Sequence, residues 1–346
     1  MKSTSAVRVI VRVPHAWCGA SPAAIVEVAE AAEELGFWGV SVQDHILQHS
    51  AVVSCGSRHA GGDDRTVFEA LQTLAFLAGN TRRVKLISAV IVLAYRHPIM
   101  LAKETAALDR LSGGRLVLGV GIGALPQRLT DGAQRLTPHA DIARREFDAL
   151  RVRAHRGRQA NEYLEALNAL WTQEQATYHG RYVSFDDLDL YPKPLQRPRP
   201  PIWVGGRSDE ALRRAVLLGD GWFPSQATAA GIADGRRRMA TIAAETGRDV
   251  QFEQGVNVFA TVAGDSAQAE LLMIDALEHR FPDREALLAA TIAGSPSRFV
   301  ERLHEYVEAG VTAFDLKLLP LGVTETLEQM RMIAEEVTPR LKVEAA

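Results

Sequence analysis

Cysteine is scarce in this chain of 346 residues, which contains only Cys18 and Cys55. Two isolated cysteines form no metal-binding or redox motif and are too few for a disulfide framework, so a small disulfide-rich secreted protein is excluded. Long apolar runs are missing too. The longest, residues 86–95, is about half the length of a membrane-spanning helix, so no transmembrane segment is expected.

A strong charge of one sign is also missing, because 39 Lys and Arg residues nearly balance 42 Asp and Glu residues. The net charge of −3 gives no reason to expect a nucleic acid or a membrane as partner. Arg8 and Arg12 interrupt the apolar character of the first residues, so no secretion signal is expected there and we expect a cytoplasmic protein. The hydrophobic content of 47% suits a globular chain with a large core.

Apolar, β-branched segments alternate along the whole chain with segments of helical periodicity. The expected strands are residues 7–13, 40–42, 84–93, 115–120, 202–204, 221–224, 252–262 and 313–319. The expected helices are residues 22–35, 68–78, 98–111, 141–171 with an interruption near Gly157, 209–218, 232–246, 296–309 and 324–337. Eight strand–helix units predict an α/β fold, a (β/α)8 TIM barrel, built as a single domain over residues 1–346.

Two segments are longer than a minimal barrel requires, and they predict insertions after strands four and seven. These segments are residues 124–200 and 264–294. A doubly wound sheet is the rival topology, but it would have its glycine-rich turn after the first strand. Here the glycine-rich segment follows the fourth expected strand, which favours the barrel.

That segment, LDRLSGGRLVLGVGIG at residues 108–123, also satisfies a loose dinucleotide-binding pattern when Ala124 is included. No helix start follows, because Pro126 and Pro138 lie nearby, so a Rossmann phosphate loop is disfavoured. We interpret the segment as the rim of strand four, where Gly121 and Gly123 leave room for a bound group. The alternative is that these glycines only permit a tight turn.

Asp44 and His45 end the second expected strand, at the catalytic end of a barrel. An imidazole with a near-neutral reference pKa can donate or accept a proton there. The alternative is a helix start with Asp44 as its N-cap. His45 and His49 have a spacing seen in metal sites, but no further ligand cluster accompanies them, so no metal site is predicted.

Gly205 and Gly206 follow strand five and precede a helix that Ser208 can cap. Two glycines before a helix N-terminus predict a phosphate site, and a bare strand-to-helix turn is the alternative. Ser225 and Gln226, after strand six, would add donors to the same phosphate.

Four further polar residues lie near the ends of expected strands. Arg12, at the end of strand one, is expected to reach the pocket and contact substrate, whereas Arg8 is expected to pair or to extend toward solvent. His97 precedes Pro98 and is a second expected substrate contact. Arg96 beside it could bind an anion or form a buried ion pair.

Several of these segments together resemble the luciferase-like monooxygenase family. The segments are AAEELGFWGVSVQDH (31–45), YRHPIMLAKETAALDRLSGGRLVLGVGIG (95–123), PPIWVGG (200–206) and GDGW (219–222). The combination is most similar to the subgroup of coenzyme F420-dependent oxidoreductases. This resemblance implies a flavin or deazaflavin at the C-terminal mouth of the barrel, with its phosphate near strands five and six.

The resemblance also implies roles for individual residues. His45 would contact the ring and take part in catalysis, and a non-proline cis peptide at Ala89–Val90 would bulge toward the ring. The expected cofactor-binding residues are Asp44, Ala89, Val90, Gly121, Gly123, Gly205, Gly206, Ser225 and Gln226. A homodimer is expected, since dimers are frequent in the family.

The sequence therefore predicts an oxidoreductase that uses coenzyme F420 for hydride transfer to or from a small organic substrate. An FMN-dependent monooxygenase of the same family is the alternative, and FMN would then replace F420. A catalytically silent flavin-binding barrel is the alternative from another class.

Overall fold

Eight parallel strands close into a barrel in the computed structural model, which describes residues 6–16, 19–47, 66–123, 145–152, 156–248, 252–320 and 322–341. In order around the barrel they are β1 (Arg8–Arg12), β2 (Gly39–Val42), β3 (Lys85–Ser88), β5 (Leu116–Gly121), β8 (Ile202–Val204), β9 (Gly221–Trp222), β10 (Glu253–Val262) and β12 (Ala313–Leu318). The pairing of β9 with β10 and of β12 with β1 closes the circle. The predicted (β/α)8 barrel is confirmed.

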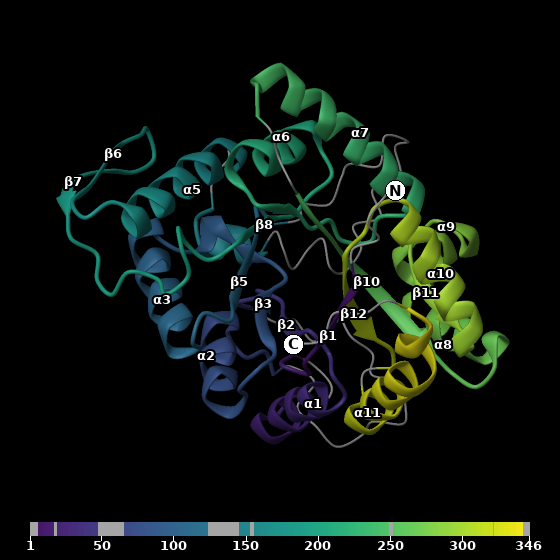
Figure 1. Cartoon of the computed structure of the whole chain (residues 1–346). Coiled ribbons are helices and arrows are strands. Elements are labelled where there is room, and N and C mark those ends of the chain that lie inside the picture. Colours follow the sequence, from purple (N-terminus) through teal and green to yellow (C-terminus); the bar gives the residue numbers. More distant parts are fainter. Residues whose placement is uncertain are drawn as a thin grey trace.

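Helices surround these strands in a ring (Figure 1). They are α1 (Pro22–Glu34), α2 (Ala70–Asn80), α3 (Pro98–Leu111), α5 (Arg156–Thr172), α6 (Asp209–Leu218), α7 (Ala229–Thr246), α10 (Pro296–Glu308) and α11 (Val323–Met332). Proline at the start and a serine N-cap define two of them, α1 after Ser21 and α10 after Ser295. After α11, a π-helical turn (Ile333–Val337) and a 3-10 turn (Thr338–Arg340) follow. None of the helices in the described part of the chain combines the length and apolar character that a membrane crossing requires.

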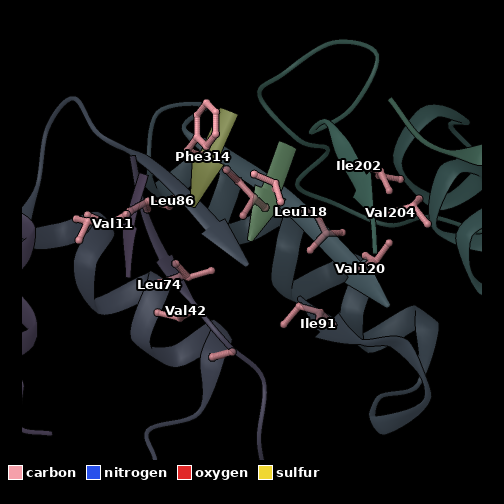
Figure 2. Packing of buried hydrophobic residues seen from close by; sticks show 14 of the residues in the cluster. Val11, Val42, Leu74, Leu86, Ile91, Leu118, Val120, Ile202, Val204 and Phe314 are labelled. Carbon is pink, nitrogen blue, oxygen red and sulfur yellow. The ribbon is translucent and has the colours of Figure 1, made fainter. Parts of the chain in front are cut away.

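Alternate residues of each strand face the barrel interior or the helices, as the period of two in a strand requires. The interior holds Ile10, Trp38, Ile87, Val117, Trp203, Phe223 and Ala313. The Trp38 and Trp203 rings stack there with their centroids 6.0 Å apart. The helix-facing layer is larger, and Figure 2 shows several of its side chains, among them Val11, Leu86, Leu118 and Phe314.

Strand three is broken, although residues 84–93 were expected to form one strand. β3 ends at Ser88, β4 (Ile91–Val92) resumes beside β5, and the cis peptide Ala89–Val90 lies between them. Strand four makes room for this displacement. A Cβ at Gly119 would lie 1.9 Å from the Ser88 carbonyl oxygen, and one at Gly121 would lie 2.7 Å from Val90 Cγ2. An apolar run alone does not reveal such a break, because every residue in it suits a strand.

Both predicted insertions contain elements of their own. After β5, residues 145–149 are helical, α5 follows after a break, and an antiparallel hairpin of β6 (Ala176–His179) and β7 (Ser184–Leu188) projects beyond the ring of helices (Figure 1). The hairpin was not predicted, because its strands are short and largely polar. After β10 come α8 (Ser266–Leu277), η2 (Glu278–Arg280), α9 (Arg284–Ala289) and β11 (Ile292–Gly294), which pairs with β10.

Three charged side chains at the N-terminal end of the barrel are paired with protein groups. Arg8 pairs with Glu253 at 2.7 Å, as one of its two expected roles requires. Asp109 is fully buried and accepts hydrogen bonds from the backbone N–H and the side-chain amide of Gln196. Arg115 donates five hydrogen bonds to neighbouring carbonyl and hydroxyl oxygens. This end of the barrel is therefore a stability element.

Candidate functional site

The candidate site is the mouth formed by the C-terminal ends of the barrel strands. Because all eight strands are parallel, residues at their C-terminal ends meet at one rim. The sequence-predicted residues at this rim are Arg12, Asp44, His45, Ala89, Val90, Gly121, Gly123, Gly205, Gly206, Ser225 and Gln226. His97 lies further along the chain as the exposed N-cap of α3, where its Nδ1 accepts a hydrogen bond from Ile99 N at 3.3 Å.

His45 lies against a buried carboxylate that the sequence analysis did not identify. Glu146, on the helical turn that precedes α5, is fully buried, and its Oε2 lies 3.6 Å from His45 Nδ1. The Tyr95 hydroxyl donates to the same oxygen at 2.8 Å, while the backbone N–H groups of Ile46 and Leu47 donate to Oε1. The His45 side chain remains 35% exposed. Glu146 thus contacts one edge of the imidazole, while the rest of the side chain stays accessible from the mouth.

The protonation states around Glu146 follow from these contacts. Burial opposes ionisation of Glu146, but hydrogen bonds from His45, Leu47 and Tyr95, together with the charge of His45, hold its pKa below the usual value. Burial, the Glu146 charge and the hydrogen bond to it raise the pKa of Tyr95. At neutral pH the carboxylate is therefore ionised and the phenol protonated, so Glu146 accepts and Tyr95 donates.

Asp44 links two segments through hydrogen bonds: the turn that contains His45 and the loop after β3. Both of its carboxylate oxygens bind Arg96, at 2.6 and 2.8 Å, and one also accepts from Val92 N at 2.9 Å. Arg96 additionally pairs with Glu69, and its side chain is 12% exposed. Of the two readings of Arg96, the structure shows the buried ion pair. Burial opposes the charge of Arg96, yet the two carboxylates raise its pKa, so the pair stays ionised.

The glycine-rich rim of strand four packs closely under the insertion that follows it. Gly123 has φ +73°, and a Cβ on it would lie 2.5 Å from the Phe147 ring. Arg156 donates to the Gly123 carbonyl at 3.0 Å, and its guanidinium lies 4.5 Å from the Phe147 ring centroid. Gly121 packs against Val90 in the same way, since a Cβ on Gly121 would lie 2.7 Å from Val90 Cγ2. These two glycines therefore fix the shape of the rim on the Val90 side.

The predicted phosphate site has the donors it needs. Ser208 caps α6 by accepting from Ala211 N at 3.3 Å. The N–H groups of Gly206, Arg207 and Ser208 donate to none of the carbonyl or side-chain oxygens that the structure describes. Their position at the start of α6 adds the positive end of the helix dipole. The Gly206 carbonyl is occupied by Trp222 Nε1 at 2.7 Å, which fixes the turn.

Because Gly205 has no side chain, a bound group can lie close to the backbone at the barrel mouth. A Cβ on this residue would reach ordinary contact distance of Val120 O at 3.4 Å, Phe223 O at 3.5 Å and Val90 Cγ1 at 3.6 Å. Ser225 Oγ lies 3.2 Å from Asn257 Oδ1 on the neighbouring strand. A phosphorylated flavin or deazaflavin fits this arrangement. The site offers free N–H donors, a helix N-terminus and a space that a side chain at Gly205 would fill.

The floor of the mouth is a polar cluster around Asp315 of β12. Arg12 donates to Asp315 Oδ2 at 2.9 Å and to Gln43 Oε1 at 2.9 Å. Ser41 donates to Asp315 Oδ1 at 2.6 Å, and the Asn257 side-chain amide donates to the other oxygen. Arg12 was expected at this mouth from the sequence, whereas Asp315 was not. The signal was present, since Asp315 alternates with apolar residues in strand eight as Arg12 does in strand one.

No group of three or more His, Cys, Asp and Glu side chains that could hold a metal is found within the described ranges. His49, considered above as a partner of His45, lies outside those ranges.

Comparison with known proteins identifies the family. Its sequence model, described as luciferase-like monooxygenase, matches residues 7–313. An uncharacterised Mycobacterium tuberculosis protein is 30% identical over 84% of this chain and 92% of its own length. The F420-dependent glucose-6-phosphate dehydrogenase of Microbacterium testaceum is 26% identical over 93% and 94%. The FMNH2-dependent dimethylsulfone monooxygenase of Pseudomonas putida is 28% identical over 60% and 52%.

Solved structures share the fold. The F420-dependent tetrahydromethanopterin reductase of Methanopyrus kandleri superposes with a TM-score of 0.75 at 17% identity, covering 97% of this chain and 99% of that one. A monooxygenase of Streptomyces bottropensis gives a TM-score of 0.74 at 21% identity, with 96% and 99% coverage. The matched sequence model and the closed parallel barrel agree: this chain belongs to the luciferase-like monooxygenase family, in which both F420-dependent and FMN-dependent oxidoreductases occur.

Proposed function

We propose that this protein is an oxidoreductase that uses coenzyme F420 to pass a hydride to or from a small organic substrate. The observation that carries the proposal is the His45–Glu146 pair. It presents a partly exposed imidazole, backed by a buried carboxylate, at the rim that also carries Ala89–Val90 and the α6 N-terminus. An acid–base group beside a hydride acceptor suits the oxidation of an alcohol or the reduction of a carbonyl.

The relatives support F420 over FMN. The F420-dependent glucose-6-phosphate dehydrogenases of two bacteria align with more than nine-tenths of this chain and of their own lengths. The FMNH2-dependent sulfone monooxygenase aligns over 52% of its length. FMN therefore stays the second candidate. We also propose a homodimer, in line with the frequency of closed twofold assemblies.

Each residue has a proposed task in the reaction. The deazaflavin, when bound, supplies or accepts the hydride. The N–H groups of residues 206–208 bind its phosphate, with Gly205 close to its chain and Ser225 and Gln226 beside it. Ala89, Val90, Gly121 and Gly123 support the ring from the strand-three side. Asp44 holds the turn on which His45 stands.

His45 is the proposed proton carrier. With Nδ1 facing Glu146, the carboxylate fixes the ring orientation and stabilises the protonated imidazole that forms when His45 takes a proton from a substrate hydroxyl. In the reverse direction the same imidazolium donates that proton. Arg12 and His97 are the proposed substrate contacts.

Titration of the purified protein with coenzyme F420 and with FMN, followed by absorbance and fluorescence, tests the cofactor. We expect tight binding of F420 and anaerobic reduction of bound F420 by a substrate alcohol. Binding of reduced FMN with substrate-dependent oxygen consumption would instead establish the monooxygenase. Binding of either cofactor without turnover on any substrate of a broad alcohol and aldehyde panel would indicate a silent flavin-binding barrel.

A further inference from the structure

Three buried N–H donors lie at the barrel mouth. Arg12 Nε, Gln43 Nε2 and Arg280 Nε find no hydrogen-bond partner in the described part of the chain. The Arg12 side chain is 8% exposed and Gln43 is 9% exposed, so water access is limited. Native proteins leave few buried polar atoms without partners. Because all three atoms are donors, a ligand that satisfies them would supply acceptor atoms.

Positive charge gathers on the same side of the mouth. Phe259 of β10 and Lys317 of β12 lie directly opposite each other in the sheet. Lys317 Nζ is 4.9 Å from the Phe259 ring centroid, and the Arg280 guanidinium carbon is 5.6 Å from the same centroid. Lys317 and Phe259 are each 5% exposed. Two basic side chains therefore lie against one buried aromatic ring, where an anion would favour their charged forms.

Asp315, the carboxylate beside these groups, is already shared by several donors. Its two oxygens already accept from Arg12, Ser41 and Asn257. Burial and the positive charges of Arg12 and Arg280 hold the pKa of Lys317 well below that of an ordinary lysine, against the opposing charge of Asp315. Burial lowers the pKa of Arg280 to about 10. An additional negative group would offset this repulsion and favour both cations.

The placement of these groups separates them from the proposed cofactor contacts. Arg12, Lys317 and Arg280 belong to β1, β12 and the segment after β10, and Gln43 follows β2. Ala89–Val90 and the α6 N-terminus instead follow strands three and five. In the order of strands around the barrel, β10 lies across from β3 and β12 lies across from β5. A molecule bound there would face the ring from the side opposite Val90.

We propose that Arg280, Lys317 and the unpaired donors of Arg12 and Gln43 bind an oxyanion of the substrate, a carboxylate or a phosphate. This inference rests on the proposed function, because it assigns the mouth opposite Val90 to the substrate. The reacting hydroxyl or carbonyl would then point toward His45, while the oxyanion anchors the other end. The substrate class is accordingly an acidic alcohol, aldehyde or ketone.

The test measures binding of small oxyanions without any turnover. Thermal unfolding and isothermal calorimetry are carried out with inorganic phosphate and with acetate, against chloride at equal ionic strength. The variants are Arg280→Gln and Lys317→Met. Arg284→Gln is the matched control, because Arg284 lies four residues from Arg280, is 63% exposed and pairs with Glu270. Each protein is measured alone and saturated with coenzyme F420.

Phosphate or acetate should stabilise the wild type beyond chloride, and the better probe identifies the oxyanion. Arg280→Gln and Lys317→Met should weaken that binding at least about tenfold, as expected when a charge-assisted hydrogen bond is lost, whereas Arg284→Gln should not. If Lys317→Met does not fold, Arg280→Gln decides, since Arg280 lies on the insertion outside the barrel strands.

Equal oxyanion binding by Arg280→Gln and wild type, or no stabilisation beyond chloride, would overturn the inference. F420 binding together with either of those results refutes the substrate anion site and leaves the proposed function standing. Arg280-dependent oxyanion binding by a protein that binds no F420 refutes the proposed function instead.

Discussion

The two ends of the barrel treat buried charge in opposite ways. At the N-terminal end, Arg115 satisfies its guanidinium with five protein acceptors, and Asp109 is enclosed by donors from Gln196 and its neighbour. At the mouth, Arg12 and Arg280 each keep a buried Nε without an acceptor in the described residues. Burial is similar at the two ends, so hydrogen-bond completeness is what separates a structural charge from one that awaits a ligand.

The first prediction removes the candidate acid–base group at the mouth. His45→Ala should lower single-turnover rate by about 10²–10⁴-fold, because a positioned acid–base group contributes that much. Cofactor affinity and the free energy of unfolding should change little, since the side chain is 35% exposed. Glu146→Gln serves as the matched variant, with a smaller loss of about tenfold from one charge-assisted contact. Turnover of His45→Ala within about threefold of wild type would assign the proton to another group.

The second prediction removes the fully paired guanidinium at the N-terminal end. Arg115→Met should lower the free energy of unfolding by about 2–4 kcal/mol, because several buried carbonyls lose their donor. Cofactor affinity per folded molecule should stay at the wild-type value. Urea denaturation measures the first quantity and cofactor titration the second. Arg237→Gln is the control, since Arg237 is 72% exposed and should change stability by less than about 0.5 kcal/mol. Wild-type stability of Arg115→Met would remove the structural role.

The third prediction tests whether the cofactor phosphate lies beside Gly205 and Gly206. Gly206 has φ +98°, so a side chain there strains the turn whatever it binds. Gly205 has ordinary contacts for a Cβ and is the better position. Gly205→Asp should weaken cofactor binding by about 10–100-fold through repulsion of the phosphate, whereas Gly205→Ala should weaken it less. Equal losses in the two variants would indicate a steric effect and no phosphate contact.

The last prediction concerns His15, a buried histidine at the mouth whose two ring nitrogens are both paired with backbone groups. His15 is 1% exposed, its Nδ1 binds Val13 O at 3.0 Å, and its Nε2 lies 3.1 Å from the Gln43 backbone. Burial, opposed by these hydrogen bonds, lowers its pKa to about 3. The unfolded chain therefore binds one more proton between about pH 3 and 6.5, so stability rises with pH across that window.

His15→Gln should remove this slope of about 1.4 kcal/mol per pH unit from the acid side of the stability profile. Urea denaturation between pH 4 and pH 7 measures it, with pH values chosen to span about two units below the reference pKa of ~6.5. His45→Ala is the comparison variant and should leave this slope in place. An unchanged slope in His15→Gln would mean that other groups take up the proton.

Most of the barrel could be predicted because its strands are continuous apolar runs and its helices begin with proline or serine caps. The break at Ala89–Val90 could not be derived from composition, because alanine and valine suit an unbroken strand. Only the family resemblance implied it. The hairpin of β6 and β7 was missed since its few residues alternate weakly and bury little.

The site was predictable where motif and strand end coincide, as at His45 and Gly205. Glu146 was not, because nothing in the sequence around it links an insertion residue to a histidine so far away in the chain. Asp315 and Lys317 carried a usable signal, charged residues on one face of an apolar strand, that was recognised only for strand one.

The origin of Glu146 has a consequence for engineering. Glu146, which contacts the His45 ring, comes from the segment between β5 and α5 and not from the barrel strands. It also accepts hydrogen bonds from two backbone amides in the turn after β2. A chimera that exchanged this segment for that of a relative would keep an intact barrel and an intact His45. It would regain activity only if the donor segment returned a carboxylate to the same place. Exchanging this loop would therefore exchange part of the proposed acid–base site together with substrate preference.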